Sequence, residues 1–399
     1  MSTDAPKPLQ PGDPADLKTF QAGRREVQYQ YSSFLPEPIN REWILSDPRT
    51  LTLLEEATRL LGELNAFSQL IPDVDFFIRM HVAKEATTSS RIEGTRTNLE
   101  EALVEEQDLN PERRDDWTEV HNYIQAVHHA IGQLPTLPLS NRLLRETHAI
   151  LLQSGRGQAR QPGEFRTGQN WIGPSLKHAT FVPPHPSHVP ALMSDLELFL
   201  HNERIHVPHL IRIALIHYQF ETIHPFNDGN GRLGRLLIVL YLVHFGLLAK
   251  PALYLSDFFE RHKGEYYDQL MGVRDTSRLE PWLRFFLVGV QETASQSIQV
   301  FKDILALKER IERTLLPTFH GRRQANAQRL LRLLYQSPVV TIRTVAERLA
   351  VPTNTATALI TDFVRLGIMR EMTGQKRNRL FIFQDYVRLF TLSSERPEP

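Results

Sequence analysis

The sequence contains no cysteine among its 399 residues. Disulfide bonds are therefore excluded, and so is any zinc site that is built on thiolates. The pattern His-Glu-x-x-His is absent as well, which removes one large class of metalloproteases. A chain without cysteine fits a reducing compartment, so we expect a cytoplasmic protein.

Long apolar runs are also missing. Residues 1–14 are polar and rich in proline, without the apolar stretch of a signal peptide. The longest apolar run, Leu236–Leu248, contains His244 and is too short to span a bilayer. We therefore expect a buried core helix at this run and no membrane partner.

The chain has no net charge, but its charges are unevenly distributed. It contains 46 Lys and Arg and 46 Asp and Glu. Residues 321–399 contain thirteen Lys and Arg against six Asp and Glu, a net charge of +7, so the remainder carries −7. A basic C-terminal segment suggests a nucleic-acid or acidic-protein partner, although a basic domain without such a partner has the same composition.

Apolar residues recur every three or four positions along most of the chain, which predicts a mainly helical protein. We expect residues 1 to about 32 to be disordered or peripheral, with regular structure beginning near Phe34. Thr97–Glu100 is typical of a capping box. The predicted helices cover residues 49–64, 74–92, 117–134, 140–153, 187–202, 208–223, 231–245, 255–274 and 280–315.

Residues 224–235 read His-Pro-Phe-Asn-Asp-Gly-Asn-Gly-Arg-Leu-Gly-Arg and combine several chemical groups in a short stretch. His224 can accept a proton, and the Asp228 carboxylate suits a hard divalent cation. The residues Gly229–Gly231 open a predicted helix, whose first N–H groups bind anions. Arg232 and Arg235 share one helix face and offer forked donors that match phosphate oxygens. The stretch predicts a nucleoside polyphosphate site with a divalent cation.

The same residues also allow two other interpretations. Asn-Asp-Gly-Asn-Gly is also ordinary turn chemistry. A calcium-binding loop that begins at Asp228 is excluded, because Arg232 stands where an oxygen ligand is required. The conjunction of all the groups within twelve residues favours a functional site.

The stretch resembles the signature of the Fic family, His-x-Phe-x-Asp/Glu-Gly-Asn-Gly-Arg-x-x-Arg, and matches it at every fixed position. Members of this family mostly transfer the AMP of ATP to a hydroxyl side chain of a target protein. The resemblance implies ATP and Mg²⁺ as cofactors, His224 as general base and Asp228 as the Mg²⁺ ligand. The nucleotide-binding residues that it implies are Asn227, Gly229, Asn230, Gly231, Arg232, Gly234 and Arg235.

A second resemblance lies near the end of the predicted helix 74–92. Many Fic proteins have an autoinhibitory helix with the pattern Ser/Thr-x-x-x-Glu-Gly/Asn, and Ser89, Glu93 and Gly94 fill it here. The resemblance implies that Glu93 restrains the enzyme. The alternative is an ordinary surface glutamate at a helix end.

Residues 163–186 break the helical pattern, with aromatic and β-branched residues between glycines and prolines. This pattern predicts a short hairpin, which resembles the flap of Fic proteins. The edge of such a flap can pair with an extended segment of a target protein and place a hydroxyl near His224. A plain surface hairpin has the same pattern.

The C-terminal residues predict three short helices followed by two strands, 368–371 and 379–383, which is typical of a winged helix-turn-helix domain. Lys376, Arg377 and Arg379 at the wing are suited to phosphate contacts. The expected recognition helix carries Arg365 as its one basic residue. A DNA partner and a protein-docking or dimerising role therefore both stay open, as does a homodimer.

We thus predict a mainly α protein: a Fic-type helical bundle with a short β-hairpin flap, and a C-terminal winged helix-turn-helix domain. The expected parts are a peripheral N-terminus (1–32), a helical segment with the inhibitory helix (33–112), the catalytic core (113–318) and the winged helix (319–399). The implied function is that of a protein adenylyltransferase that is autoinhibited by Glu93. Alternatives are another phosphate-linked donor, AMP removal, or an ATP-sensing DNA-binding regulator.

Overall fold

The computed structural model describes residues 15–16, 20–70, 74–154, 159–374 and 378–391. The predictions for Lys376 and Arg377 fall outside these ranges. The chain divides into two compact units, each assembled from several segments, and the predicted domain boundaries cut across them. The first unit comprises Met1–Leu61, Gln125–Leu247 and His262–Glu292, and the second comprises Gly62–Ile124, Leu248–Arg261 and Thr293–Pro399.

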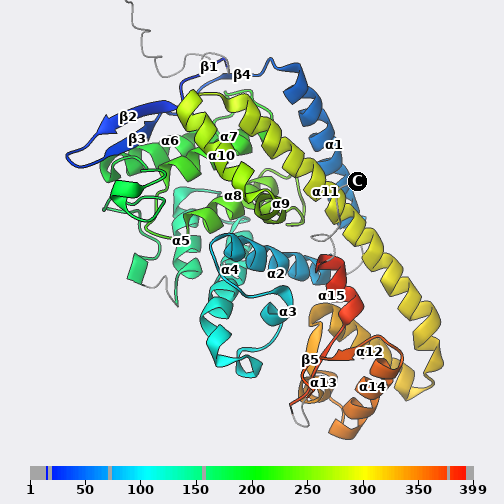
Figure 1. Ribbon diagram of the computed structural model, residues 1–399. Coiled ribbons are helices and arrows are strands. Elements are labelled where there is room, and N and C mark those ends of the chain that lie inside the picture. The colour runs from blue at the N-terminus through cyan, green and yellow to red at the C-terminus, as the bar shows by residue number, and fades with distance from the viewer. Residues whose placement is uncertain (1–14, 17–19, 71–73, 155–158, 375–377, 392–399) are drawn as a thin grey trace, which may run out of the picture. The chain divides into compact units, whose positions relative to one another are not determined.

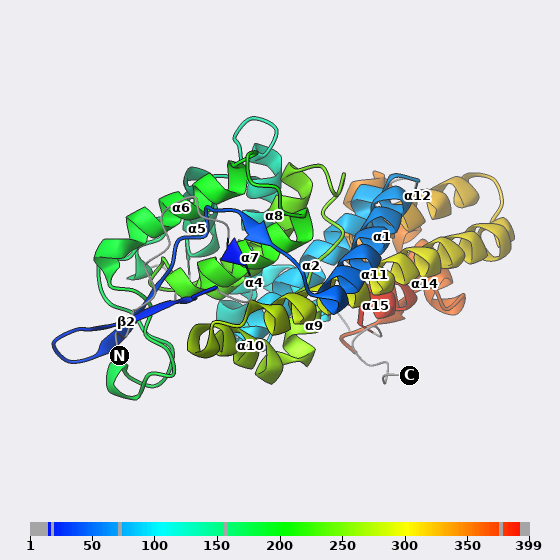
Figure 2. The same cartoon turned by 90° about the horizontal axis from the view of Figure 1, so that it is seen from above.

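The first unit is built around two adjacent helices, α7 and α8 (Figures 1 and 2). Its elements are β1 (Ala15–Asp16), β2 (Gly23–Val27), β3 (Ser32–Pro36), β4 (Trp43–Ile44), α5 (Asn141–Leu151), α6 (Val189–His201), α7 (His209–Ile223), α8 (Asn230–His244) and α10 (Lys263–Thr276). Every residue of α7 from Leu210 to Ile223 is buried, and so are Leu236–Leu242 of α8. A helix that is buried all round belongs in a core, which confirms the prediction for the apolar run.

The loop between α7 and α8 is set by two left-handed residues. His224 closes α7 at φ 50° and ψ 61°, and Gly229 precedes α8 at φ 75°. The signature residues 224–235 therefore lie at the end of the helix pair where α7 stops and α8 begins.

The N-terminal region is more ordered than the sequence predicts. Phe20 and Ala22 are buried, and β2 and β3 form an antiparallel hairpin with Gly23 opposite Pro36 and Val27 opposite Ser32. Regular structure therefore begins before Phe34. The short strands β1 and β4 pair in parallel.

The second unit contains the helix that carries the predicted inhibitory motif. Its elements are α2 (Val74–Ile92), α3 (Leu99–Ala102), α9 (Ser256–Arg261), α12 (Arg322–Gln336), β5 (Val339–Thr341), α13 (Ile342–Leu349), α14 (Thr353–Arg365), β6 (Arg370–Glu371), β7 (Leu380–Ile382) and α15 (Gln384–Thr391). Three helices contain residues of both units, namely α1 (Pro48–Leu70), α4 (Arg114–Gln133) and α11 (Leu279–Arg310). A π-helical turn, Ile311–Leu315, follows α11.

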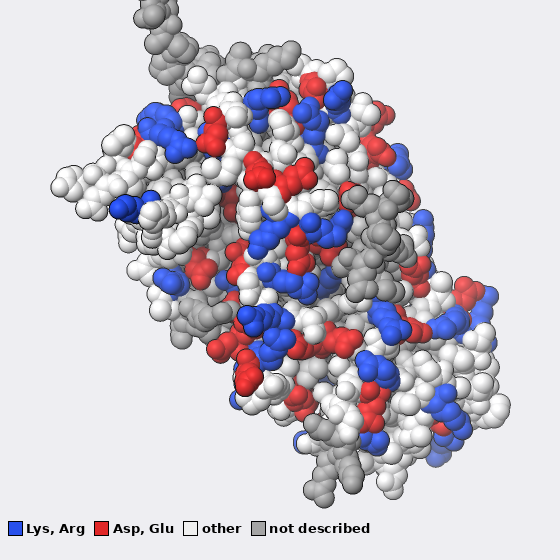
Figure 3. All heavy atoms as spheres, in the orientation of Figure 1, with Lys and Arg blue, Asp and Glu red and all other residues white. Residues whose placement is uncertain are grey.

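The C-terminal part has the predicted order of three helices, α12, α13 and α14, followed by the two strands β6 and β7. Its antiparallel sheet has the order β5-β7-β6. The strand β5 and the helix α15 were not predicted. On the face shown in Figure 3, Lys and Arg side chains are interspersed with Asp and Glu.

Three local predictions are corrected. The capping box is formed by Asn98 and Glu101, one residue later than expected. The helix predicted over 255–274 is interrupted at His262, between α9 and α10. The expected flap hairpin has a single bridge, between Ile172 and Phe181, and the chain between these residues contains a 3-10 turn at Leu176–His178. Within the described ranges, no helix is both long and apolar enough to cross a membrane.

Candidate active site

The loop from His224 to Gly229 holds its first residue in a strained conformation. A positive φ is costly for a residue with a side chain and persists where the surroundings fix it. The His224 N–H donates to the Phe220 carbonyl at 2.9 Å. The His224 carbonyl accepts from Arg166 Nε at 2.9 Å and from Asn170 Nδ2 at 3.2 Å. The main-chain N–H and the carbonyl of His224 are therefore both fixed by hydrogen bonds.

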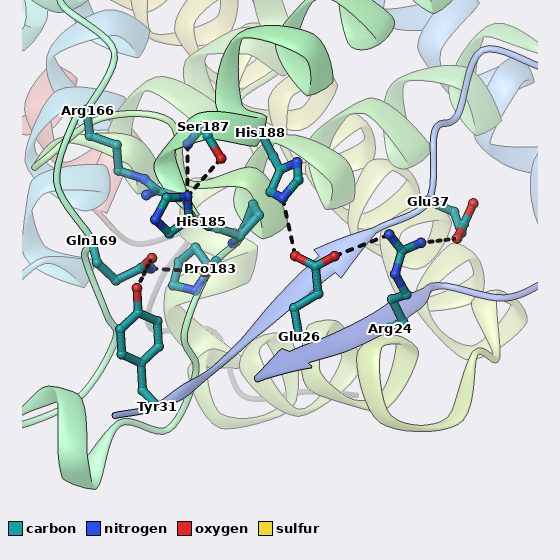
Figure 4. A network of polar contacts seen from close by, with 11 residues as sticks. Arg24, Glu26, Tyr31, Glu37, Arg166, Gln169, Pro183, His185, Ser187 and His188 are labelled. Atoms are coloured by element: carbon teal, nitrogen blue, oxygen red, sulfur yellow. Dashed lines mark hydrogen bonds and ion pairs between the residues drawn. The ribbon is translucent and has the colours of Figure 1, made fainter. Parts of the chain in front are cut away.

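Arg166 connects the loop to the segment that carries the flap. Its side chain is 2% exposed, and its guanidinium donates to the carbonyls of His224, Ile223, Pro184 and Gly168. Burial lowers the pKa of Arg166 to about 10, so the group stays charged at neutral pH. Figure 4 shows this side chain reaching toward the loop at Pro183–Ser187. The sequence analysis did not single out Arg166, because its partners are carbonyls up to 58 residues away.

The Asn230 side chain organises the loop from inside. The Phe226 N–H donates to Asn230 Oδ1, and Asn230 Nδ2 donates to the Phe226 carbonyl, both at 2.8 Å. Since the side-chain amide is engaged there, Asn230 can contribute to an anion site through its main-chain N–H. The Phe226 ring is fully buried and stacks on His148, with centroids 3.8 Å apart.

His148, on α5, fixes the backbone of the candidate metal ligand. The Gly163 N–H donates to His148 Nδ1 at 2.8 Å, so the ring proton lies on Nε2, which donates to the Asp228 carbonyl at 2.9 Å. Burial lowers the pKa of His148 to about 4. A neutral imidazole with a fixed tautomer thus holds the turn. The sequence placed His148 in a helix but gave no sign of this contact.

The Asp228 carboxylate points outward at the start of α8. Its side chain is 45% exposed, its Oδ1 accepts from the Gly229 N–H at 2.6 Å, and Arg232 lies 3.7 Å away. No group of three metal-ligating side chains occurs among the described residues. A Mg²⁺ ion held by one carboxylate together with phosphate and water oxygens is an ordinary coordination, so this donor set fits the ion.

The remaining signature residues are Asn227 in the loop and Arg232, Gly234 and Arg235 in the first turns of α8. Arg232 and Arg235 are each 4% exposed on consecutive turns of α8. Gly234 lies against α7, where an added Cβ would collide with a Glu221 oxygen, so helix packing accounts for the glycine. Asn227 Nδ2 donates to the Gln161 side chain at 3.1 Å.

The structure thus brings the predicted site residues of the signature into one loop and the first turns of one helix. A proton acceptor, an exposed carboxylate and a helix N-terminus with arginines can together hold a phosphate chain next to an incoming nucleophile.

The three predicted inhibitory residues lie in the second unit, at the end of α2. Ser89 is buried, whereas Glu93 is exposed just beyond the helix. The Glu93 N–H donates to the Ser90 carbonyl at 3.1 Å, and Gly94 has a φ of 105°. The glycine is therefore required by the backbone at this helix end.

Comparisons with known proteins agree with the motif. Residues 51–132 match the family described as "Fic/DOC family N-terminal", and residues 138–242 match "Fic/DOC family". The "Protein adenylyltransferase Fic" of Culex quinquefasciatus is 34% identical over 151 residues, 38% of this chain and 27% of that protein. The protein of the same name from Aedes aegypti is 34% identical over 132 residues, 33% and 24% of the two chains. The matches thus span about a quarter of the length of these relatives.

A similar fold occurs in a solved structure described as a Fic family protein from Desulfovibrio desulfuricans G20. The match has a TM-score of 0.53 at 20% identity and covers 85% of this chain and 97% of that one. This likeness concerns the fold. The two family matches show that the chain contains a Fic/DOC family N-terminal domain and a Fic/DOC family domain, and the complete signature lies within the second.

Proposed function

We propose that this chain transfers AMP from ATP to a Ser, Thr or Tyr hydroxyl of a target protein. The observation that carries the proposal is the placement of His224, Asp228 and the α8 N-terminus on one fixed loop. The name "Protein adenylyltransferase Fic" of the two insect relatives supports it.

The reaction requires an in-line attack of the hydroxyl oxygen on the α-phosphorus of ATP. In this proposal His224 accepts the hydroxyl proton as the new P–O bond forms and the bond to pyrophosphate breaks. Arg166 and Asn170 both donate to the His224 carbonyl, so they fix the main chain from which the imidazole projects.

The phosphates are held by the first turn of α8. The main-chain N–H groups at Gly229–Gly231 and the positive end of the helix dipole favour bound anions. Arg232 and Arg235 supply forked donors for the outer phosphates. When bound at Asp228, Mg²⁺ offsets the negative charge that develops on the leaving pyrophosphate.

Autoinhibition is part of the proposal and is supported by the Ser89–Glu93–Gly94 pattern. A carboxylate at the position of the γ-phosphate would repel it and shift ATP out of line with the hydroxyl. The geometry of the α2 end, with Gly94 in the left-handed region, suits a glutamate presented beyond the helix.

The test uses ATP labelled at the α-phosphate and a protein mixture as acceptor. We expect label on hydroxyl side chains with the wild type, and a loss of roughly 10²–10⁴-fold for His224→Ala, because general-base catalysis contributes about this much. ATP binding to His224→Ala, measured by calorimetry, should stay near the wild-type value.

The same assay separates the alternatives. When the ATP carries its label at the γ-phosphate instead, labelled protein would indicate a kinase-like reaction, and a preference for UTP over ATP would indicate another nucleotide donor. Retained α-label transfer by His224→Ala would contradict the assigned role of the histidine.

A further inference from the structure

A pocket in the second unit lies between the first turns of α2, the end of α11 and α12, which packs against α2 (Figure 1). Its volume is about 370 Å³, within the range of about 300–1,000 Å³ that is usual for small-molecule sites. Every residue that lines it belongs to the second unit, and none of them belongs to the signature or to the Ser89–Glu93–Gly94 motif. The proposed function therefore leaves this pocket without a role.

The inner wall of the pocket is apolar. Phe77, Leu316 and Leu331 are between 1% and 3% exposed, and Tyr335 is 4% exposed. The rings of Phe77 and Tyr335 meet edge to face, with centroids 5.8 Å apart and an angle of 84° between their planes. The two rings hold each other in place, so the wall favours a ligand with an apolar or aromatic body.

The Tyr335 hydroxyl adds a polar group to this wall. Its oxygen is buried, and within the described part of the chain it has no hydrogen-bond partner. Burial raises the pKa of Tyr335, and the carboxylate of Glu312, which also lines the pocket, raises it further. The hydroxyl therefore keeps its proton and can donate it to a ligand that carries an acceptor.

Two cations also line the pocket. Lys308, on the last turns of α11, is half-buried, and Arg332, on α12, is exposed. Neither forms an ion pair with another residue of the described ranges, whereas the nearby Arg310 pairs with Asp385 at 2.7 Å. The charges of Lys308 and Arg332 are thus available to a ligand.

Glu312 determines the net charge of the pocket. It follows Lys308 by four residues, so its charge offsets one of the two cations and leaves a net charge of +1. A ligand with one negative charge balances this. Arg332 and Tyr335 are three residues apart and share one face of α12, so both can donate to the same carboxylate.

We propose that this pocket binds a small organic acid, with its apolar or aromatic body against Phe77, Leu331 and Tyr335 and its single carboxylate at Arg332. Such a ligand contacts α12 and the first turns of α2 at the same time, and so ties these two helices together. The Ser89–Glu93–Gly94 motif lies at the other end of α2. The inference does not depend on AMP transfer.

The first test uses 3-phenylpropionate as the probe and its neutral amide, 3-phenylpropionamide, as the matched control. The full chain is titrated with each compound, and binding is followed by ligand-observed NMR. We expect a Kd on the order of 1 mM for the acid, as is usual for a ligand of this size. The amide should bind about tenfold more weakly, because it lacks the charge that Arg332 recognises. No binding of the acid at about ten times the expected Kd, or equal binding of the acid and the amide, would overturn the proposal.

Substitutions then locate the carboxylate. Arg332→Gln should weaken binding of the acid about tenfold, and Tyr335→Phe roughly two- to tenfold. Glu312→Gln should tighten it roughly two- to fivefold, since it removes a like charge. Arg343→Gln is the control, because this exposed arginine on α13 pairs with Glu347 and does not line the pocket. The same Kd in Arg332→Gln and Arg343→Gln would mean that the acid binds elsewhere, which contradicts the proposal.

Hydrogen exchange, measured by mass spectrometry, tests the tie between the two helices. With the acid at saturation, amides of α2 near Phe77 and of α12 near Tyr335 should exchange roughly threefold more slowly or less, and those of α8 should not change. Slower exchange at α8 without any effect at α2 and α12 would show that the acid binds the candidate phosphate site instead, and the proposal would fail.

The two proposals can fail separately, because none of these measurements uses AMP transfer. A chain that binds the acid at Arg332 but labels no protein contradicts the proposed function alone. A chain that transfers the α-phosphate label but binds the acid and the amide equally contradicts this inference alone.

Discussion

Arg166 shows how one buried side chain can define a catalytic loop. Its guanidinium reaches carbonyls on both the His224 side and the flap side, and no hydrophobic residue could do so. Four donations to main-chain oxygens compensate for the burial of the charge. Arg166 is thus a positioning residue, which acts on the reaction through His224.

We expect Arg166→Lys to lower kcat about 10- to 100-fold with little change in the KM for ATP. A lysine ammonium is a single centre and cannot reproduce the planar fork. Steady-state kinetics with labelled ATP measures the split, and Arg142→Lys, which alters an exposed pair with Glu146, is the control. A rise in the KM for ATP with unchanged kcat would show that Arg166 acts on nucleotide binding instead.

At the scale of elements, the contact between α7 and α8 depends on a missing side chain. Gly234 allows the two helices to approach, and an added Cβ would meet a Glu221 oxygen and come within 3.0 Å of the Phe220 ring. The loop His224–Gly229 joins these two helices, so the distance between the helices determines the distance that the loop must bridge.

We predict that Gly234→Ala destabilises the protein by about 1–3 kcal/mol, as overpacking of a core usually does. Gly272→Ala is the control: this glycine lies inside α10 with open space around its Cβ position. The control should stabilise by about 0.5–1 kcal/mol, because alanine is the better helix former. Urea unfolding of both variants gives the comparison, and a neutral Gly234→Ala would mean that the helices can shift without cost.

The end of α2 gives a second prediction at this scale. Glu93→Gly should raise AMP transfer by roughly tenfold or more, since a bias of 1.4 kcal/mol already changes a population tenfold. Glu93→Gln retains the bulk and removes the charge, so it separates repulsion from obstruction. Turnover of Glu93→Gly at the wild-type level, with ATP and Mg²⁺ saturating, would reduce Glu93 to an ordinary helix-end residue.

The sequence alone was sufficient to predict the helices in which apolar residues recur every three or four positions, and to identify the signature at residues 224–235. It predicted α7, α8 and the loop between them because apolar spacing and turn residues act locally. It failed for β2, whose residues Gly-Arg-Arg-Glu-Val carry no alternating pattern and whose order comes from distant partners. His148 and Arg166 were missed for the same reason: their partners are 80 and 58 residues away.

The whole molecule contains buried histidines that must stay neutral. His217, on α7, lies between the Gly234 carbonyl and the Tyr266 hydroxyl, both at 2.9 Å. Burial lowers its pKa from 6.5 to about 3. The unfolded chain therefore binds a proton at a higher pH than the folded chain, and the stability present above about pH 6.5 is lost as the pH falls toward 3.

We expect the free energy of unfolding to decrease below about pH 6 by up to about 1.4 kcal/mol per pH unit for each such histidine. The His217→Gln variant should show a shallower dependence than the wild type between about pH 6 and pH 4.5, above most carboxylate titrations. Urea unfolding at several pH values measures it, with the exposed His178→Gln as control. Parallel curves for His217→Gln and the wild type would contradict the shift.

The partner of the C-terminal part stays a prediction. Arg379, which precedes β7, lies 3.5 Å from Glu371 and packs over Phe381. Both signs of charge occur on the face displayed in Figure 3. These observations are compatible with a DNA partner and with a protein partner.

The double hydrogen bond of Asn230 also has a chemical consequence over time. Asn230 precedes Gly231, a pair in which the glycine nitrogen readily attacks the side-chain carbonyl carbon and releases ammonia. In the folded chain both ends of that amide are hydrogen-bonded to Phe226, which restrains the side chain and should slow the attack. Deamidation then proceeds in molecules that have unfolded, and the resulting aspartate lacks the donor for the Phe226 carbonyl. The fraction of aspartate at residue 230 should therefore increase with the time that the molecules of an aged sample have spent unfolded.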